Sequence, residues 1–184
     1  MTLEIWVLAG ALVAIASVAL TTVLTGSPPT PTSPAVRRAV LELLPARLPG
    51  GEAAPIIELG AGWGGLSLAL AKRYPDRAVI GLEISPLPWL VSRLRLVFQP
   101  RPNLRLRFGD FRKCELSGNG LVVCYLSANL LAELRGKLEA ELPAGALVVS
   151  STFAIPDWQP VDRVTARDLY KSPVYLYEVG GPER

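Results

Sequence analysis

The sequence predicts an α/β fold: a mostly parallel sheet flanked by helices, closed by an antiparallel pair of strands and preceded by one apolar helix. Three observations support this prediction. An apolar strand runs into a glycine-rich turn and a helix over residues 56–74, apolar strands and helical stretches then alternate, and residues 5–24 carry no charge. Strands that alternate with helices typically form parallel sheets. At 184 residues the chain can hold one such domain and an appendage.

Composition excludes several kinds of chemistry. The chain contains no histidine, which argues against a zinc site, a histidine general base and a histidine-based triad. Its two cysteines, Cys114 and Cys124, lack metal-ligand spacing, and we interpret them as reduced thiols on neighbouring strands. We therefore expect no bound metal.

The uncharged run over residues 5–24 predicts an N-terminal membrane anchor at residues 1–25. As a helix it would extend about 30 Å, the thickness of the hydrocarbon layer. A signal peptide is the alternative, but Glu4 precedes the run without any basic residue, and the run is too long. A buried core helix is a weaker alternative, because the run is apolar on all sides. The nearest basic residues all follow it and predict a single-pass protein with its domain on the cytoplasmic side: Arg37, Arg38 and Arg47.

A linker rich in Pro, Ser and Thr is predicted at residues 26–34, and the folded domain at residues 35–184. Apolar spacing over residues 35–48 predicts a short amphipathic helix, with Ser33 as its N-cap and Pro34 in its first turn.

The glycine-rich turn follows the strand at residues 56–59 and precedes a helix at residues 66–74. Glycine permits tight turns and close approach of a ligand, and the first turn of a helix offers free N–H groups to an anion. We therefore expect a nucleotide-type site at the carboxyl end of this strand. A tight turn that binds nothing is the alternative.

Glu58 distinguishes between the nucleotides that such a turn can bind. The spacing of Gly60, Gly62 and Gly65 also fits a dinucleotide fingerprint, but a carboxylate at position 58 would repel a pyrophosphate and favour a cationic ligand. S-adenosylmethionine is such a ligand. The motif resembles that of the class I S-adenosylmethionine-dependent methyltransferases, an acidic residue followed by x-Gly-x-Gly-x-Gly. The resemblance implies a Rossmann-like, seven-stranded sheet with a C-terminal antiparallel hairpin.

Later segments fit the same pattern. A strand at residues 78–84 ends in Glu83, which lies 23 positions beyond Gly60, close to the spacing of a carboxylate that accepts from ribose hydroxyls. An exposed charge at the end of a strand is the alternative. Two prolines, Pro86 and Pro88, are expected to delay the next helix until residues 89–98.

The remaining strands are predicted at residues 104–108, 121–126, 146–153, 161–166 and 174–179, with a helix at residues 130–141. The resemblance implies that Asp110, after the first of these strands, accepts from the adenine amino group and that Phe111 packs on the ring. The end of the strand at 121–126 falls where acceptor chemistry sits in such sheets.

Basic residues cluster between positions 93 and 113, either as a solvated face or as a contact with anionic lipid headgroups. We do not expect nucleic-acid binding, because no aromatic residues are interleaved with the charges. The cluster comprises Arg93, Arg95, Arg101, Arg105, Arg107, Arg112 and Lys113.

Four further features resemble the small protein-lysine methyltransferases, both the broad-specificity archaeal type and the membrane-anchored type that modifies the c-subunit of ATP synthase. They are residues 31–34, 81–86, 125–126 and 142–160. The resemblance implies a cofactor pocket formed by Glu58, Gly60, Ala61, Gly62, Gly64, Glu83, Ile84, Asp110 and Phe111. It implies an acceptor site with Tyr125 and Asn129 as catalytic residues and Tyr125 and Trp158 as substrate contacts, and Thr32 or Ser33 closing over the cofactor.

Three functions remain open from the sequence. The first is methyl transfer from S-adenosylmethionine to lysine side chains of a protein, with a membrane-embedded protein as one candidate acceptor. Deprotonating such a lysine at pH 7.5 costs roughly 4 kcal/mol, and desolvation reduces that cost, so no histidine is required. The second is methylation of a lipid or membrane-soluble small molecule. The third is a non-catalytic module, because Trp63 and Gly65 stand where the family carries an acidic residue and an arginine.

Overall fold

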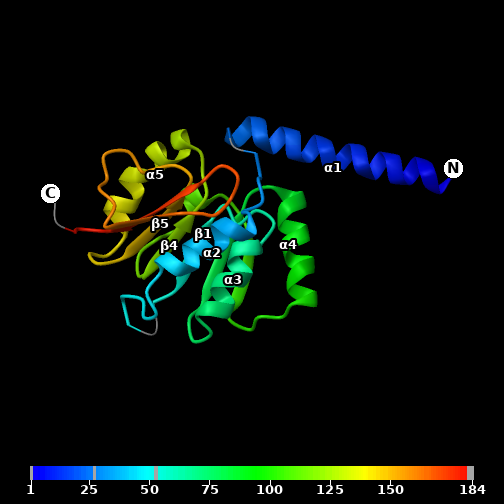
Figure 1. The fold of residues 1–184 in the computed structure, drawn as a ribbon. Coiled ribbons are helices and arrows are strands. Elements are labelled where there is room, and N and C mark those ends of the chain that lie inside the picture. The colour runs from blue at the N-terminus through cyan, green and yellow to red at the C-terminus, as the bar shows by residue number, and fades with distance from the viewer. Residues whose placement is uncertain (1, 27, 52–53, 182–184) are drawn as a thin grey trace.

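The computed structural model describes residues 2–26, 28–51 and 54–181, and these contain the predicted seven-stranded sheet (Figure 1). Its strand order is β3-β2-β1-β4-β5-β7-β6, in which β3, β2, β1, β4 and β5 are parallel, β7 is antiparallel to β5, and β6 is antiparallel to β7. The strands are β1 Ile56–Leu59, β2 Val79–Glu83, β3 Leu104–Phe108, β4 Leu121–Cys124, β5 Leu147–Ser151, β6 Asp162–Thr165 and β7 Pro173–Glu178. The predicted fold class is therefore confirmed for the sheet.

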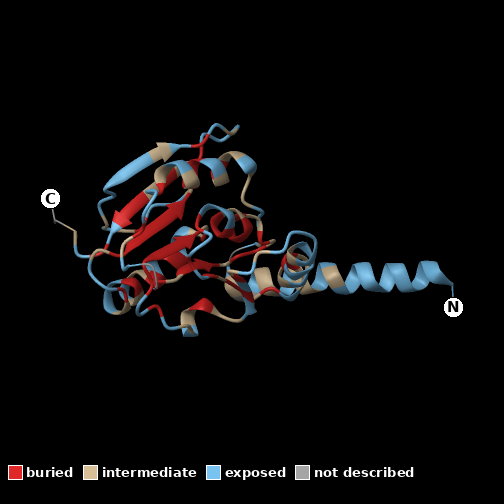
Figure 2. Ribbon diagram, turned by 90° about the horizontal axis from the view of Figure 1, so that it is seen from below, coloured by how far each residue is buried: buried red, intermediate tan, exposed pale blue. Residues whose placement is uncertain are grey.

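Helices cover both faces of this sheet. They are α1 Leu3–Thr25, α2 Pro34–Leu43, α3 Gly65–Arg73, α4 Pro86–Phe98 and α5 Ala128–Glu141, with a 3-10 turn at Phe111–Lys113. Residues of α2 and α3 pack with one face of the central strands, and residues of α5 pack with the other. Because β1, β4 and β5 are buried along their whole length, they form the centre of the core (Figure 2).

Several local boundaries differ from the sequence prediction. The predicted delay by Pro86 and Pro88 is wrong, because α4 begins at Pro86, with Ser85 as its N-cap. A proline in the first helical turn lacks only an N–H that has no partner there. The amphipathic helix is shorter than predicted and ends at Leu43. Cys114 follows the 3-10 turn instead of lying on a strand; both cysteines are free, as expected.

Most of the N-terminal helix α1 extends away from the domain (Figure 1). Its segment Leu3–Val23 is long and apolar enough to cross a membrane, judged by length and composition. The end of α1 nearer the domain contacts α4. Residue 1 of the predicted anchor, residue 27 of the predicted linker, and residues 52–53 and 182–184 of the predicted domain lie outside the described residues.

Gly81 in β2 allows α3 to pack tightly against the sheet. A Cβ atom at this position would lie 2.6 Å from Ser67 Oγ and 2.8 Å from Leu106 Cδ2. Both neighbouring residues are buried, so they have little room to move.

We predict that Gly81→Ala destabilises the fold by about 1–3 kcal/mol, because the added methyl group overpacks this contact. Gly136→Ala is the matched control: Gly136 lies exposed within α5, and nothing is within 4 Å of its ideal Cβ. That change should stabilise the protein by about 0.5–1 kcal/mol. Chemical denaturation measures both effects, and equal stabilities of the two variants would contradict the prediction.

Candidate cofactor and acceptor site

A cavity opens at the carboxyl ends of β1, β2 and β4. Seven of the residues predicted from the sequence line it: Gly60, Gly62, Glu83, Ile84, Asp110, Phe111 and Tyr125. The other predicted residues, Glu58, Ala61, Gly64, Asn129 and Trp158, do not line the cavity.

The glycine turn is held to the end of β2 by Glu83. The backbone N–H of Gly62 donates to Glu83 Oε2 at 2.6 Å, and the backbone N–H of Ser85 donates to Oε1 at 2.7 Å. Glu83 is only 5% exposed, so these bonds offset the cost of burying its carboxylate. Each carboxylate oxygen retains a lone pair with which it can accept from a ligand hydroxyl at the cavity wall.

Gly60 and Gly64 serve different purposes although both have a positive φ, of 73° and 76°. Gly60 borders the cavity, where a side chain would approach Leu126. At Gly64 a Cβ atom would lie 2.7 Å from the Cβ of Ser92, so this glycine lets the start of α3 approach α4. The structure gives Gly64 a packing role between α3 and α4, and a ligand contact at this position stays a prediction.

Glu58 lies under the glycine turn, away from the cavity. It is 3% exposed and accepts a short hydrogen bond from the hydroxyl of Ser67 in α3. Burial raises the pKa of Glu58 to about 8, with a smaller upward contribution from the charge of Glu83. Burial thus favours the neutral form of this carboxyl group in the structure, and a contact between Glu58 and a cationic ligand stays a prediction.

Asp110 and Phe111 lie together on the cavity wall, where β3 gives way to the 3-10 turn. Asp110 Oδ1 accepts from the backbone N–H of Arg112 at 3.0 Å, and the Arg112 guanidinium lies 3.4 Å from Oδ2. Phe111 is 8% exposed, and the same guanidinium lies 5.7 Å from its ring centroid. Arg112 also lines the cavity, a role that the sequence did not signal because it belongs to a longer basic cluster.

The linker forms one wall of the cavity, through residues that precede the predicted Thr32 and Ser33. Thr25, at the end of α1, and residues 28–30 line the cavity. Thr32 and Ser33 do not: the carbonyl of Thr32 accepts from Arg37, and Ser33 Oγ caps α2 by accepting from the backbone N–H of Val36. The N-cap predicted at Ser33 is thereby confirmed.

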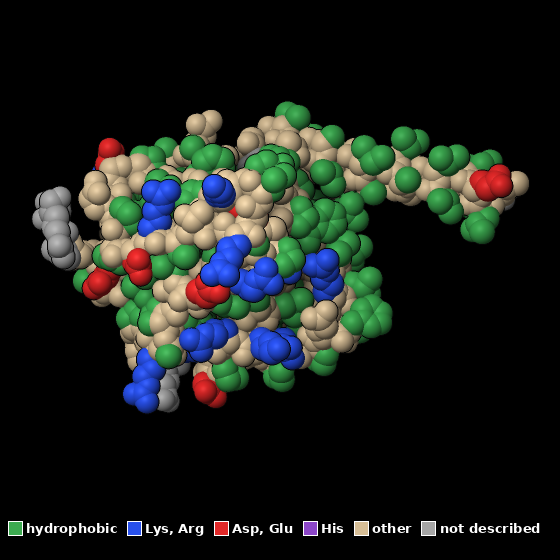
Figure 3. Space-filling view, in the orientation of Figure 1, with side chains coloured by type: hydrophobic (Ala, Val, Ile, Leu, Met, Phe, Trp, Pro, Cys, Tyr) green, Lys and Arg blue, Asp and Glu red, His purple; other side chains and the backbone are tan. Residues whose placement is uncertain are grey.

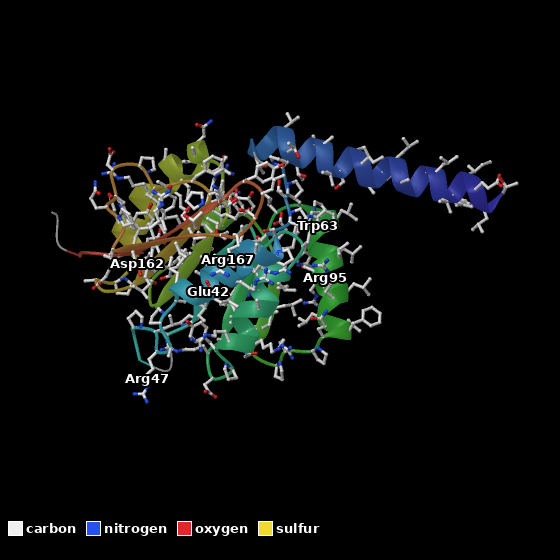
Figure 4. The ribbon with its side chains drawn as sticks, in the orientation of Figure 1. Glu42, Arg47, Trp63, Arg95, Asp162 and Arg167 are labelled. Carbon is white, nitrogen blue, oxygen red and sulfur yellow. The ribbon has the colours of Figure 1, made fainter. Side chains whose placement is uncertain are left out.

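Trp63 attaches this linker to the glycine turn. The Trp63 Nε1 donates to the carbonyl of Pro29 at 2.6 Å. The guanidinium of Arg95, in α4, donates to the backbone carbonyl of Trp63 at 3.0 Å (Figure 4). The residue that departs from the family pattern thus joins the glycine turn, the linker and α4.

Tyr125 is half-buried and faces the cavity from the loop after β4, beside Leu126 and Leu130. Asn129 is exposed in the first turn of α5. Trp158 packs edge-on against Tyr177, with ring centroids 5.7 Å apart, and its Nε1 donates to Glu139 at 2.8 Å. Its partners are therefore in the core and on α5 instead of in the cavity.

Known proteins resemble this chain in both sequence and structure. A sequence model described as the ANTKMT methyltransferase domain matches residues 58–162. The chain is 36% identical to an adenine nucleotide translocase lysine N-methyltransferase of Mus musculus, over 78% of this chain and 63% of that protein. It is 30% identical to a protein-lysine N-methyltransferase of Saccharolobus islandicus, over 68% of this chain and 79% of that protein.

Among solved structures, an RNA methyltransferase from Salinibacter ruber in complex with S-adenosyl-L-homocysteine superposes with a TM-score of 0.71. It is 26% identical, and the match covers 84% of this chain and 97% of that one. The chain spans less than two thirds of the mouse enzyme that it resembles.

We predict that Glu58 makes the stability of the protein fall as pH rises. Its pKa is near 4.5 when unfolded and about 8 when folded, so between these values the folded state holds the extra proton. The free energy of unfolding should therefore decrease by up to about 1.4 kcal/mol per pH unit across this window and be unaffected by Glu58 above it. Glu58→Gln, which mimics the neutral form, should flatten this dependence in denaturation curves from pH 5 to 9. Glu178→Gln, at an exposed site, should keep the original slope. A steep slope retained in Glu58→Gln would show that another group is responsible.

We also predict that Trp63→Phe weakens ligand binding in the cavity. The change removes the hydrogen bond to Pro29 and releases the linker wall, a loss of about 0.5–1.5 kcal/mol, or roughly two- to tenfold in Kd. Calorimetric titration of the full-length chain with S-adenosylhomocysteine measures this. Trp89→Phe is the matched control, because the Trp89 indole also donates to a carbonyl, that of Leu106 at 3.4 Å, outside the cavity. Unchanged affinity in Trp63→Phe would mean that the wall does not contribute to binding.

Proposed function

Because the chain belongs to the family defined by the ANTKMT methyltransferase domain, we propose that it transfers methyl groups from S-adenosylmethionine to lysine side chains of a protein. Two observations support this proposal together. The cavity lies where a strand-end carboxylate and a glycine turn meet, and relatives with matching sequences are named lysine methyltransferases.

The residues around the cavity fit the proposed cofactor. Glu83 can accept from ribose hydroxyls, and Asp110 has a carboxylate oxygen at the cavity wall for an adenine amino group. Phe111 offers an apolar ring face, and Gly60 and Gly62 leave room for close approach. The cofactor supplies a methyl group on a positively charged sulfur. The glycine turn is rigidly held, so the protein can act mainly by positioning the two reactants.

Tyr125, Leu126 and Leu130 form the part of the cavity that we assign to the acceptor amine. A lysine ammonium that enters this half-buried, largely apolar region loses hydration, which lowers its pKa and favours the neutral nucleophile. Tyr125 can orient the amine through its hydroxyl. Asn129 stands exposed beside Leu130, and we assign it to the surface that contacts the rest of the substrate. We do not assign Trp158 to the acceptor site, because its indole donates a hydrogen bond to Glu139.

We further propose that α1 anchors the protein in a membrane, with the domain on the cytoplasmic side, and that the acceptor lysine belongs to a membrane protein. The supporting observation is the position of Thr25. It ends α1 and also lines the cavity, so an embedded α1 brings the cavity to the membrane surface. A lysine that emerges from a bilayer near the headgroups would lie at the same level. Methylation of a lipid or a membrane-soluble small molecule fits the same geometry and is the second candidate.

We predict that the full-length chain in lipid nanodiscs binds S-adenosylmethionine and that Glu83→Ala raises its Kd more than tenfold. The change removes the ligand carboxylate and leaves the N–H groups of Gly62 and Ser85 without their acceptor. Glu42→Ala, at an exposed site on α2, serves as the matched control and should leave Kd unchanged (Figure 4).

Radiolabelled cofactor then identifies the acceptor when the protein is incubated with membranes from its source. Label on lysines in the protein fraction supports the proposal. Label in the organic phase favours the lipid or small-molecule acceptor, and label in an RNA fraction would overturn both. Tight binding of cofactor without any transfer would favour a non-catalytic module.

A further inference from the structure

Helix α4 turns its most apolar side outward. Leu90 is 59% exposed, Leu94 54%, Val97 72% and Phe98 77%. Their spacing of four, three and one residues places them along one side of the helix. The residues of α4 that are buried against the domain are instead Pro88 and Ser92. A helix on the surface of a water-soluble domain shows the opposite arrangement, so this apolar stripe requires an explanation.

The stripe has basic residues beside it and an aromatic extension. Arg93 lies between Leu90 and Leu94 in sequence and stacks at 5.9 Å on the ring of Trp89. Trp89 in turn contacts Phe108 at the end of β3, 5.6 Å between ring centroids, and Phe108 is 54% exposed. Arg95 is exposed on α4 and is held by the carbonyl of Trp63. Exposed leucines, an exposed phenylalanine and adjacent arginines are the composition of a helix that lies in a lipid–water interface.

The position of α1 indicates what covers the stripe. α1 contacts α4 near the start of α4 and then extends away from the domain on the side where α4 forms its edge (Figure 1). Figure 3 shows hydrophobic side chains along this edge over α4, below the base of α1, with basic side chains next to them. The candidate span reaches Val23, close to the base of α1, so a bilayer that holds the whole span must come up to α4.

We propose that the apolar stripe of α4, formed by Leu90, Leu94, Val97 and Phe98, is a second membrane contact that seats the domain on an anionic bilayer. The inference rests on the proposed anchoring by α1 and adds a fixed orientation to it. With α1 alone, only the linker and the contact between α1 and α4 would set the orientation of the domain. With α4 in the headgroup layer, the cavity at the base of α1 is held at a constant height over the membrane.

The test uses nitroxide labels on the full-length chain in vesicles of phosphatidylcholine with a third of phosphatidylglycerol. Single cysteines replace Leu94 or Val97 in the stripe, Leu12 in α1, and Ala140 as a water-exposed control on α5, which covers the other face of the sheet. Cys114→Ser removes the partly exposed native thiol; Cys124 is fully buried, and burial raises its pKa to about 12, so it will not react. Collision rates of each label with oxygen and with a water-soluble nickel chelate report its depth.

We expect the oxygen-to-nickel ratio at positions 94 and 97 to exceed that at position 140 at least threefold, with position 12 also in lipid. A lipid-like position 12 with water-like positions 94 and 97 would overturn the α4 contact and leave the anchor intact. A water-like position 12 would overturn both. Dipolar broadening between labels at position 94 on two molecules would show that a second copy of the chain covers the stripe, which also overturns the proposal.

Discussion

The backbone amides of Gly62 and Ser85 donate to the carboxylate of Glu83, and the rest of the cavity depends on these two bonds. They join the turn after β1 to the turn after β2, where the two parallel strands end side by side. The turn itself has a positive φ at Gly60, Gly62 and Gly64, a conformation that other residues adopt only with strain. A buried carboxylate that lost these donors would carry an uncompensated charge, so the same two bonds support both stability and the shape of the site.

The linker connects the cavity wall to the N-terminal helix α1. Arg37 of α2 donates to the carbonyl of Thr32 at 2.9 Å and crosses over Gly65, where a Cβ atom would lie 2.6 Å from its guanidinium. Trp63 holds the linker at Pro29. The two positions that depart from the family pattern therefore have a shared structural reason: both accommodate or bind the segment that closes the cavity. Their departure does not by itself argue against catalysis.

Much of the fold could be predicted from the sequence, because its strands are short apolar runs separated by glycine and proline signals. The seven-stranded sheet, its closing antiparallel pair and the positions of Glu83, Asp110, Phe111 and Tyr125 after strand ends all follow from the family pattern. Membership of a lysine methyltransferase family was also predicted and is confirmed. Residues 28–30 could not be assigned to the cavity, because their place depends on a contact with Trp63 across more than thirty residues of chain.

The burial and the packing partners of single residues could not be predicted from the sequence. The interpretation of Glu58 rested on a charged carboxylate, whereas its burial under the glycine turn raises its pKa to about 8 and Ser67 donates a hydrogen bond to it. Trp158 was assigned to the acceptor site on the resemblance to the protein-lysine methyltransferases. Its partners, Tyr177 and Glu139, lie nineteen positions away along the chain in either direction, which no local pattern reveals.

The orientation of helix α4 could not be predicted from the sequence either. A stripe of leucine, valine and phenylalanine has the same periodicity whether it faces a protein core or a lipid surface, so the pattern predicts a helix without predicting its orientation. Orientation is constrained on the opposite side, where Gly64 approaches Ser92 so closely that a larger side chain at either position would clash. Ser92 must therefore face the domain, Leu96 packs partly buried against the core, and Leu90, Leu94, Val97 and Phe98 are left to face outward. Since α1 leaves the domain on that same side, the packing of one glycine against one serine supports the membrane contact that we propose.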